Sequence, residues 1–280
     1  MVRTLYSILS FFIIQTSLVF PSTSYFFSNN NIAPPLFADR GFQLTDLEIK
    51  KIISSFNTIY VPIFKKRGYT LLISNDWGVD ELNASAHKIG TIRQVSVSGG
   101  LARYPGVTSH VFAFMLCHEI GHHLGGAPLK KNRDSVEGQA DYFAATKCMR
   151  RWLQEQDLDQ MKTSLKSPYV LQKCRQVYSN NSEVKKCLLI AEAGKIVAEM
   201  SATIQSARKP IFNNPDKRVV EKSLINHPSP QCRLDTIFQG ALCDNDLETP
   251  FSMSDPSVGA CSSAKGDSVG VRPRCWFKGN

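Results

Sequence analysis

The sequence predicts an α+β protein that is mainly helical and carries a small β-sheet. Four segments place apolar residues at helical spacing: residues 44–66, 107–124, 135–154 and 158–208. Two shorter segments have the composition of strands: residues 69–74 and 94–98. The remainder after residue 242 is rich in Ser, Gly, Pro and Asp, and it predicts an irregular, Cys-rich C-terminal extension.

Local signals support the individual elements. Thr45 or Asp46 could cap the first helix, and Gly68 follows a basic last turn, as is common at helix C-termini. Residues 94–98 alternate, with Val95 and Val97 on one face and polar side chains on the other. We expect this segment to be an edge strand. It could pair with the backbone of an extended substrate or be an ordinary sheet edge.

Length and charge narrow the function classes. The chain has 280 residues, of which 42% are hydrophobic and 20% charged, so it is neither a disordered chain nor a coiled coil. The net charge of +9 suits an anionic cell-wall polymer or membrane surface. The basic residues are scattered and form no long run, which speaks against nucleic acid as a partner.

The N-terminus resembles an export signal. An apolar run over 5–20 follows Arg3, Pro21 ends it, and the small residues Ser22-Thr23-Ser24 come next. We expect a signal peptide over 1–24, one main domain over 25–242 and a Cys-containing tail over 243–280. The alternative is an uncleaved membrane anchor, although the run is shorter than the roughly 20 residues that span a bilayer. The mature protein would be periplasmic or extracellular.

Cysteine usage agrees with an oxidising compartment. None of the cysteines forms a C-x-x-C pair, which speaks against a zinc ribbon. We expect at least three disulfides in the exported protein. Pairing of near neighbours would give 174–187, 232–243 and 261–275, leaving Cys117 and Cys148 either bonded to each other or as buried free thiols. The disulfide candidates are Cys117, Cys148, Cys174, Cys187, Cys232, Cys243, Cys261 and Cys275.

The strongest functional signal is an H-E-x-x-H motif in the apolar helix over 107–124. His118 and His122 are four residues apart, so both imidazoles lie on one helix face and can bind one metal ion. Imidazole suits Zn²⁺, whose catalytic sites keep one position open for water. Glu119 is turned aside from the two imidazoles, where it could reach that water. The alternative is a hydrogen-bonded helix end without a metal.

The third ligand separates the classes of zinc peptidase. One large class would place a His at position 128, which is Pro128 here. The gluzincins use a Glu on a second helix, and Glu137 is the candidate. Asp141, one turn later, could accept a hydrogen bond from a ligand imidazole. Glu137 could instead complete a capping box that begins at Asp134.

Together these residues resemble a known family. His118-Glu119-Ile120-Gly121-His122 with Glu137-Gly138-Gln139-Ala140-Asp141 is similar to the gluzincin peptidases of the CAAX-prenyl-protease and heat-shock membrane-protease family, especially its soluble exported members. Asn83-Ala84 resembles the edge-strand segment of that family, and His227-Pro228 with Arg233 resembles its downstream element. The spacing departs from the family, because only 14 residues separate His122 from Glu137.

The resemblance implies that residues 25–242 form a zinc metallopeptidase domain with a zincin-like fold and one Zn²⁺ per chain, and it also implies a mechanism. Glu119 would act as general base, and His227 would donate a hydrogen bond to the oxyanion; His227 could equally be a surface loop residue. Arg233 would pair with Asp141 or another carboxylate, or be an exposed arginine. The expected activity is that of an exported zinc endopeptidase acting on protein or peptide. A zinc amidase acting on cell-wall peptides and a non-catalytic metallopeptidase-like binding protein are the alternatives.

Overall fold

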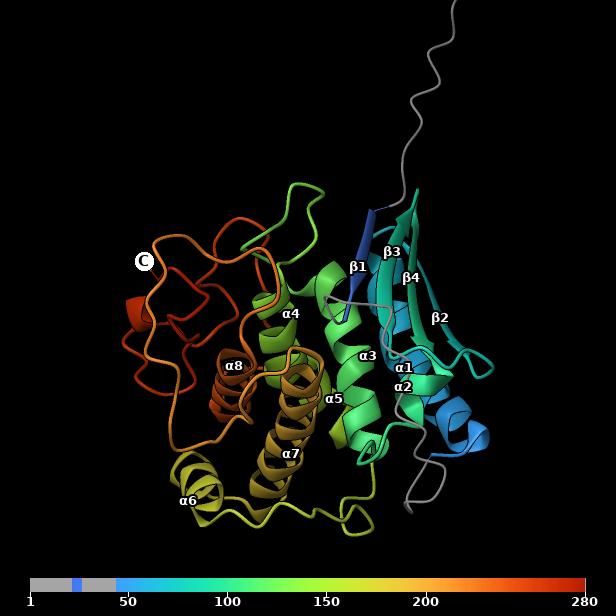
Figure 1. Ribbon diagram of the computed structural model, residues 1–280. Coiled ribbons are helices and arrows are strands. Elements are labelled where there is room, and N and C mark those ends of the chain that lie inside the picture. The colour runs from blue at the N-terminus through green and yellow to red at the C-terminus, as the bar shows by residue number, and fades with distance from the viewer. Residues whose placement is uncertain (1–21, 27–43, 280) are drawn as a thin grey trace, which may run out of the picture.

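The computed structural model describes residues 22–26 and 44–279 (Figure 1). The expected signal peptide over 1–24 lies outside these residues except for its last three, whose backbone forms part of a strand. The expected α+β class is confirmed, since the described residues are mainly helical with one small sheet.

The sheet has four strands in the order β1-β3-β4-β2. β2 and β4 run parallel, and β3 runs antiparallel both to β4 and to β1. The strands are β1 (Ser22–Tyr25), β2 (Thr70–Asp76), β3 (Ala84–Ile89) and β4 (Ile92–Ser98). The expectation of an edge strand over 94–98 is wrong, because β4 lies between β2 and the β3 strand that sequence patterning missed.

Helices build the rest of the molecule. Figure 1 shows α1 and α3 beside the sheet and α4, α7 and α8 beyond α3, with the C-terminal segment outermost. The helices are α1 (Asp46–Lys66), α2 (Gly99–Ala102), α3 (Ser109–Leu124), α4 (Glu137–Phe143), α5 (Met149–Gln154), α6 (Pro168–Val177), α7 (Asn181–Ile204) and α8 (Pro230–Leu242). A π-helical turn over Ala144–Cys148 joins α4 to α5, and a 3₁₀ turn covers Ser263–Lys265.

The first helix forms as its sequence predicts. Thr45 is the N-cap and makes a reciprocal capping box with Glu48, which satisfies two backbone donors. The helix buries one stripe, formed by Ile49, Ile52, Phe56, Tyr60 and Phe64. These residues follow the spacing of three and four that defines one helix face.

Two helical predictions need correction. The segment over 135–154 is interrupted by the π-helical turn, and residues 158–167 do not form a helix. Pro168 explains the second difference, because the residue before a proline is disfavoured in helical geometry and Ser167 caps α6 instead. Asn180 then caps α7, so the expected single long segment is divided into two helices.

All eight cysteines are paired in the structure, which confirms the expectation of at least three disulfides. Cys174–Cys187 forms as expected, and Cys117–Cys148 joins α3 to the π-helical turn. The expected 232–243 and 261–275 pairs are wrong, since the bonds are Cys232–Cys275 and Cys243–Cys261. Cys232 and Cys243 lie at opposite ends of α8, about 16 Å apart at 1.5 Å per residue, too far for a disulfide.

The C-terminal segment packs onto the helices rather than extending from them. Trp276 is fully buried, and a Cβ at Gly138 of α4 would lie 2.3 Å from its ring. Arg272 is buried as well and donates to the side-chain oxygen of Gln139. Within the described residues, no helix is both long and apolar enough to cross a membrane.

The Cys117–Cys148 bond should matter for both stability and metal binding. Replacing both cysteines with Ser should lower the free energy of unfolding by about 2–4 kcal/mol, because the unfolded chain gains freedom. If the expected His118–His122–Glu137 site binds zinc, its zinc affinity should fall too, because α3 is no longer tied to the segment that follows α4. Urea unfolding and zinc titration test this. The matched Cys174/Cys187 double variant should lose stability with unchanged zinc affinity; equal zinc loss in both would contradict the prediction.

Candidate metal centre

Three side chains from two helices converge on one point. His118 and His122 project from α3, and Glu137 is the first residue of α4. Their ligand atoms all lie within 4.8 Å of one another, and all three residues are buried. Glu137 Oε2 lies 3.2 Å from His118 Nε2 and 3.5 Å from His122 Nε2. This group could hold a metal ion.

The donor atoms fit a metal ion. The Nε2 atoms of both histidines and Oε2 of Glu137 are buried without a hydrogen-bond partner. Buried polar atoms are normally satisfied, so three orphans aimed at one point indicate a cation site. Two imidazoles and a carboxylate are a common donor set of catalytic zinc. The capping-box alternative for Glu137 fails, because the N-cap of α4 is Val136 and makes no side-chain cap bond.

The other nitrogen of each imidazole is fixed by the protein. Asp141 Oδ1 lies 2.7 Å from Nδ1 of His118, and the backbone carbonyl of Ser135 lies 2.9 Å from Nδ1 of His122. Each Nδ1–H therefore donates, which leaves Nε2 free to bind a metal. Arg233 in turn donates to Asp141 from Nε at 2.9 Å and from Nη2 at 3.1 Å. Arg233 is 1% exposed, so it is a buried partner of the site and not a surface arginine.

Glu119 lies beside the ligands with nothing bound to it. Both of its carboxylate oxygens are buried without a hydrogen-bond partner, and the residue is 0% exposed. Burial raises the pKa of Glu119 to about 8, although the nearby His118 opposes the increase. A carboxylate with a raised pKa and free oxygens has the properties of a general base that later returns its proton.

Opposite charges shift the pKa values of the ligands. Burial alone would lower the pKa of His118, but the carboxylates of Asp141 and Glu137 raise it to about 9. Burial works to raise the pKa of Glu137, yet the imidazoles of His122 and His227 hold it well below its usual range. Both shifts show a centre in which the carboxylates stabilise an added positive charge.

Lys130 is a member of the site that sequence patterns did not reveal. Its Nζ lies 2.6 Å from Oε1 of Glu137, which turns Oε2 toward the imidazoles. The lysine sits in the loop between α3 and α4, where its backbone N–H donates to the carbonyl of Asp134. With Arg233 it supplies two cations against the three carboxylates of Glu119, Glu137 and Asp141. When all three carboxylates are ionised they outnumber these two cations, which favours the binding of a further positive charge.

His227 joins the site from a long loop. Its Nε2 lies 3.0 Å from Oε2 of Glu137, and its side chain is 13% exposed. Ser229, two residues later, is the N-cap of α8 and accepts from the backbone N–H of Cys232 at 3.3 Å. Further upstream, the backbone N–H of Leu224 donates a hydrogen bond to the carbonyl of Trp276 in the C-terminal segment. The loop is thus anchored on both sides of His227.

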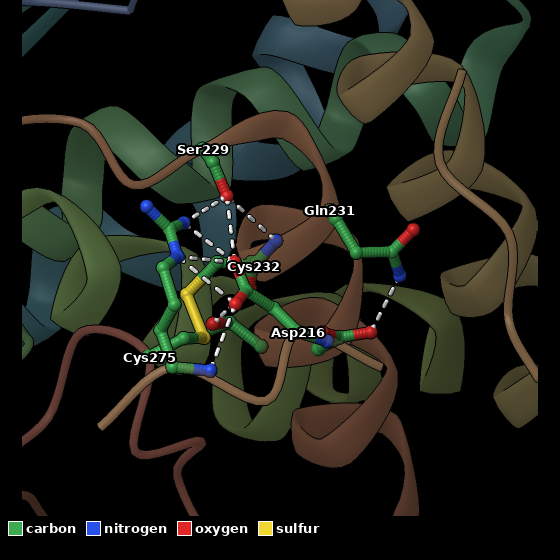
Figure 2. The surroundings of a disulfide bond; sticks show 8 residues. Asp216, Ser229, Gln231, Cys232 and Cys275 are labelled. Carbon is green, nitrogen blue, oxygen red and sulfur yellow. Dashed lines mark hydrogen bonds and ion pairs between the residues drawn. A yellow bond between two sulfur atoms is a disulfide. The ribbon is translucent and has the colours of Figure 1, made fainter. Parts of the chain in front are cut away.

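Figure 2 shows the anchor at the start of α8. The Asp216 carboxylate accepts from Ser229 Oγ at 2.9 Å and from Arg218 Nε at 3.0 Å, next to the Cys232–Cys275 disulfide. A carboxylate oxygen of Asp216 and the two sulfur atoms lie within 4.8 Å of one another, as the ligands of a metal ion could. The sulfurs are bonded to each other and the carboxylate is already satisfied, so this cluster is structural.

Two further histidines have structural roles. His110 is buried, and its Nε2 lies 3.1 Å from Oε2 of Glu192 on α7. His123 turns away from the metal ligands and packs edge-on against Phe64 of α1. These contacts join α3 to its neighbours on both sides.

The chain matches no protein family, no curated protein and no solved structure. Any function must therefore be argued from the side chains themselves.

The carboxylate behind His118 should control metal affinity. Changing Asp141 to Asn should weaken zinc binding by about 10–100-fold, because the imidazole loses the acceptor that fixes its orientation. Competition with a zinc chelator measures the affinity. Glu192→Gln is the matched control, since it disturbs another buried imidazole–carboxylate pair; it should leave zinc affinity unchanged. Unchanged affinity in Asp141→Asn would show that the acceptor does not orient the ligand.

Proposed function

We propose that this chain is an exported, zinc-dependent endopeptidase that hydrolyses peptide bonds in protein substrates. One observation carries the proposal: two imidazoles and a carboxylate converge on one point, with a second, unpartnered carboxylate on Glu119 beside them. A zincin-like fold is supported by the placement of His118 and His122 on α3, beside the sheet, and of Glu137 at the start of the next helix, α4. The four disulfides support an oxidising compartment, periplasmic or extracellular.

The roles follow from position and charge. His118, His122 and Glu137 would hold the zinc ion, which supplies Lewis-acid activation of a water and of the scissile carbonyl. Glu119 accepts the proton of the attacking water and passes it to the leaving amine, which its raised pKa favours. His227, whose side chain is partly exposed and whose buried Nε2 lies 3.0 Å from Glu137 Oε2, would donate to the oxygen of the carbonyl as negative charge develops there.

The reaction class can be tested directly. The purified protein should cleave casein, and a chelator should abolish the cleavage, with zinc restoring it. Purified cell wall offered to the same preparation distinguishes an amidase. Neither substrate cleaved, with zinc bound, would favour a non-catalytic binding protein.

Glu119 should be needed for turnover and not for zinc. A Glu119→Gln protein should keep its fold and metal while casein hydrolysis falls by about 10²–10⁴-fold, the usual contribution of a general acid–base group. Elemental analysis and casein hydrolysis on the same sample measure both. An active Glu119→Gln protein would end the proposed mechanism while leaving the metal site intact.

His227 should act mainly in the transition state. Changing it to Phe should lower kcat by about 10²–10³-fold with little change in KM, as for the loss of one oxyanion donor. Zinc content should stay the same. Ile225→Ala, an exposed change in the same loop, is the control and should behave like the parent protein. Full activity in His227→Phe would remove the oxyanion role, and loss of zinc would make His227 a ligand.

A further inference from the structure

The reactive atoms of the candidate centre are covered. His118, Glu119 and His122 are 0% exposed, and Glu137 is 3% exposed. Of the described side chains at the site, His227 and Lys130 are the partly exposed ones, at 13% and 17%. A peptide bond cannot reach Glu119 in this arrangement, so some part of the cover must move before a peptide can be cleaved.

Phe26 is part of that cover. Its ring is 0% exposed and meets the His118 ring edge-on, with 4.8 Å between centroids. The guanidinium of Arg233 lies over the same ring at 4.3 Å. The main chain of Phe26 is bound as well, because its N–H donates to the carbonyl of Ala84 at 2.9 Å and its carbonyl accepts from Arg233 Nη1 at 3.2 Å.

Phe26 directly follows β1, which is attached to the sheet through β3. β1 forms the outer edge and pairs antiparallel with β3, from Ser22 opposite Lys88 to Tyr25 opposite Ser85. Along an antiparallel strand, successive N–H groups point alternately toward and away from the neighbouring strand. The hydrogen bond from Phe26 N–H to the Ala84 carbonyl shows that the N–H of Ser24 also points toward β3, whereas that of Thr23 points away. The segment Ser22–Phe26 therefore lies as a peptide lies when it is bound by strand addition.

We propose that the outer edge of β3 is a peptide-binding site and that the chain's own segment Ser22–Phe26 occupies it, blocking the metal centre. The peptide that displaces this segment is an extended one with an aromatic residue in the place of Phe26, between His118 and Arg233. This inference rests on the proposed function, and it names both the substrate class and a form of self-inhibition. A cut after Ser24 would remove three of the four residues of β1 and weaken the block.

Recognition would come mainly from the backbone. Ala84, Ala86 and Lys88 turn their peptide groups toward β1, whereas Ser85 and His87 turn theirs toward β4. Any extended sequence can use these groups, so the aromatic slot supplies the selectivity. The Nη1 group of Arg233 would then hold the carbonyl of the aromatic residue, as it now holds that of Phe26.

Two proline substitutions test the proposal by binding, independently of turnover. In a zinc-loaded Glu119→Gln background, Ser24→Pro removes an N–H that faces β3, and Thr23→Pro removes one that faces away. A fluorescent, end-capped peptide with the sequence of residues 22–26 should bind Ser24→Pro about tenfold more tightly than the parent, the effect of about one backbone hydrogen bond. Thr23→Pro should bind like the parent, and a peptide with Ala in place of its Phe should bind more weakly. Intact mass verifies that each sample retains Ser22.

Equal peptide affinity in all three proteins would overturn the proposal and make Ser22–Phe26 a fixed part of the fold. Amide hydrogen exchange in the unsubstituted chain gives a second test that no substitution can disturb. The amides of Ala86 and Lys88 should exchange about 100-fold faster than those of Ser85 and His87, because a displaceable strand opens locally. Equal protection of the two sets would also overturn it.

The proposed function fails separately. If Ser24→Pro binds the peptide tightly but the same change with Glu119 intact cleaves no casein, the binding site stands and the peptidase does not. If casein is cleaved and Ser24→Pro neither binds the peptide more tightly nor cleaves faster than Thr23→Pro, the peptidase stands and the self-inhibition does not.

Discussion

The pair between Asp141 and His118 is the interaction on which the rest of the structure depends. Both residues are fully buried, and His118 Nδ1 lies 2.7 Å from Asp141 Oδ1. A buried charge is costly unless it is paired. Arg233 of α8 also pairs with Asp141. These charges are satisfied only if α3, α4 and α8 pack together at this point in the core. The positions of α3, α4 and α8 follow from this requirement as much as from apolar burial.

The disulfides and the C-terminal segment hold those helices in register. Cys117–Cys148 ties α3 to the segment after α4, and Cys232–Cys275 ties the start of α8 to the chain end, which packs Trp276 against α4. Three helices that share buried charges would otherwise gain much by separating and hydrating them. Covalent links reduce the freedom of the unfolded chain and so favour the assembled centre. The same segment anchors the loop that carries His227.

Sequence patterns predicted the parts of the site that are local. His118 and His122 share one helix turn, and Glu137 with Asp141 shares another, so spacing alone placed each pair on one face. Lys130 and Phe26 could not be predicted, because each reaches the site through a loop or strand whose path depends on tertiary contacts. β3 was missed for a related reason: Ala84-Ser85-Ala86 has weak strand propensity, and pairing on both sides compensates for it. The prediction of the 232–243 and 261–275 disulfides was wrong because α8 holds Cys232 and Cys243 apart in space, although they are neighbours among the cysteines of the sequence.

A metal ion entering the candidate centre would meet the same cover as the proposed peptide. The ligand atoms of His118, His122 and Glu137 are buried, so an ion can enter only while part of the cover is away from the site. Phe26 packs on His118, and its carbonyl accepts a hydrogen bond from Arg233. Arg233 also donates to Asp141. The same guanidinium therefore holds the covering segment and the carboxylate that orients His118. Displacing the segment would free a donor of Arg233, and a peptide carbonyl arriving at the same place would satisfy it again. Arg233 therefore has two roles. It holds Asp141, which orients His118, and its Nη1 donates to a peptide carbonyl when a segment occupies the edge of β3.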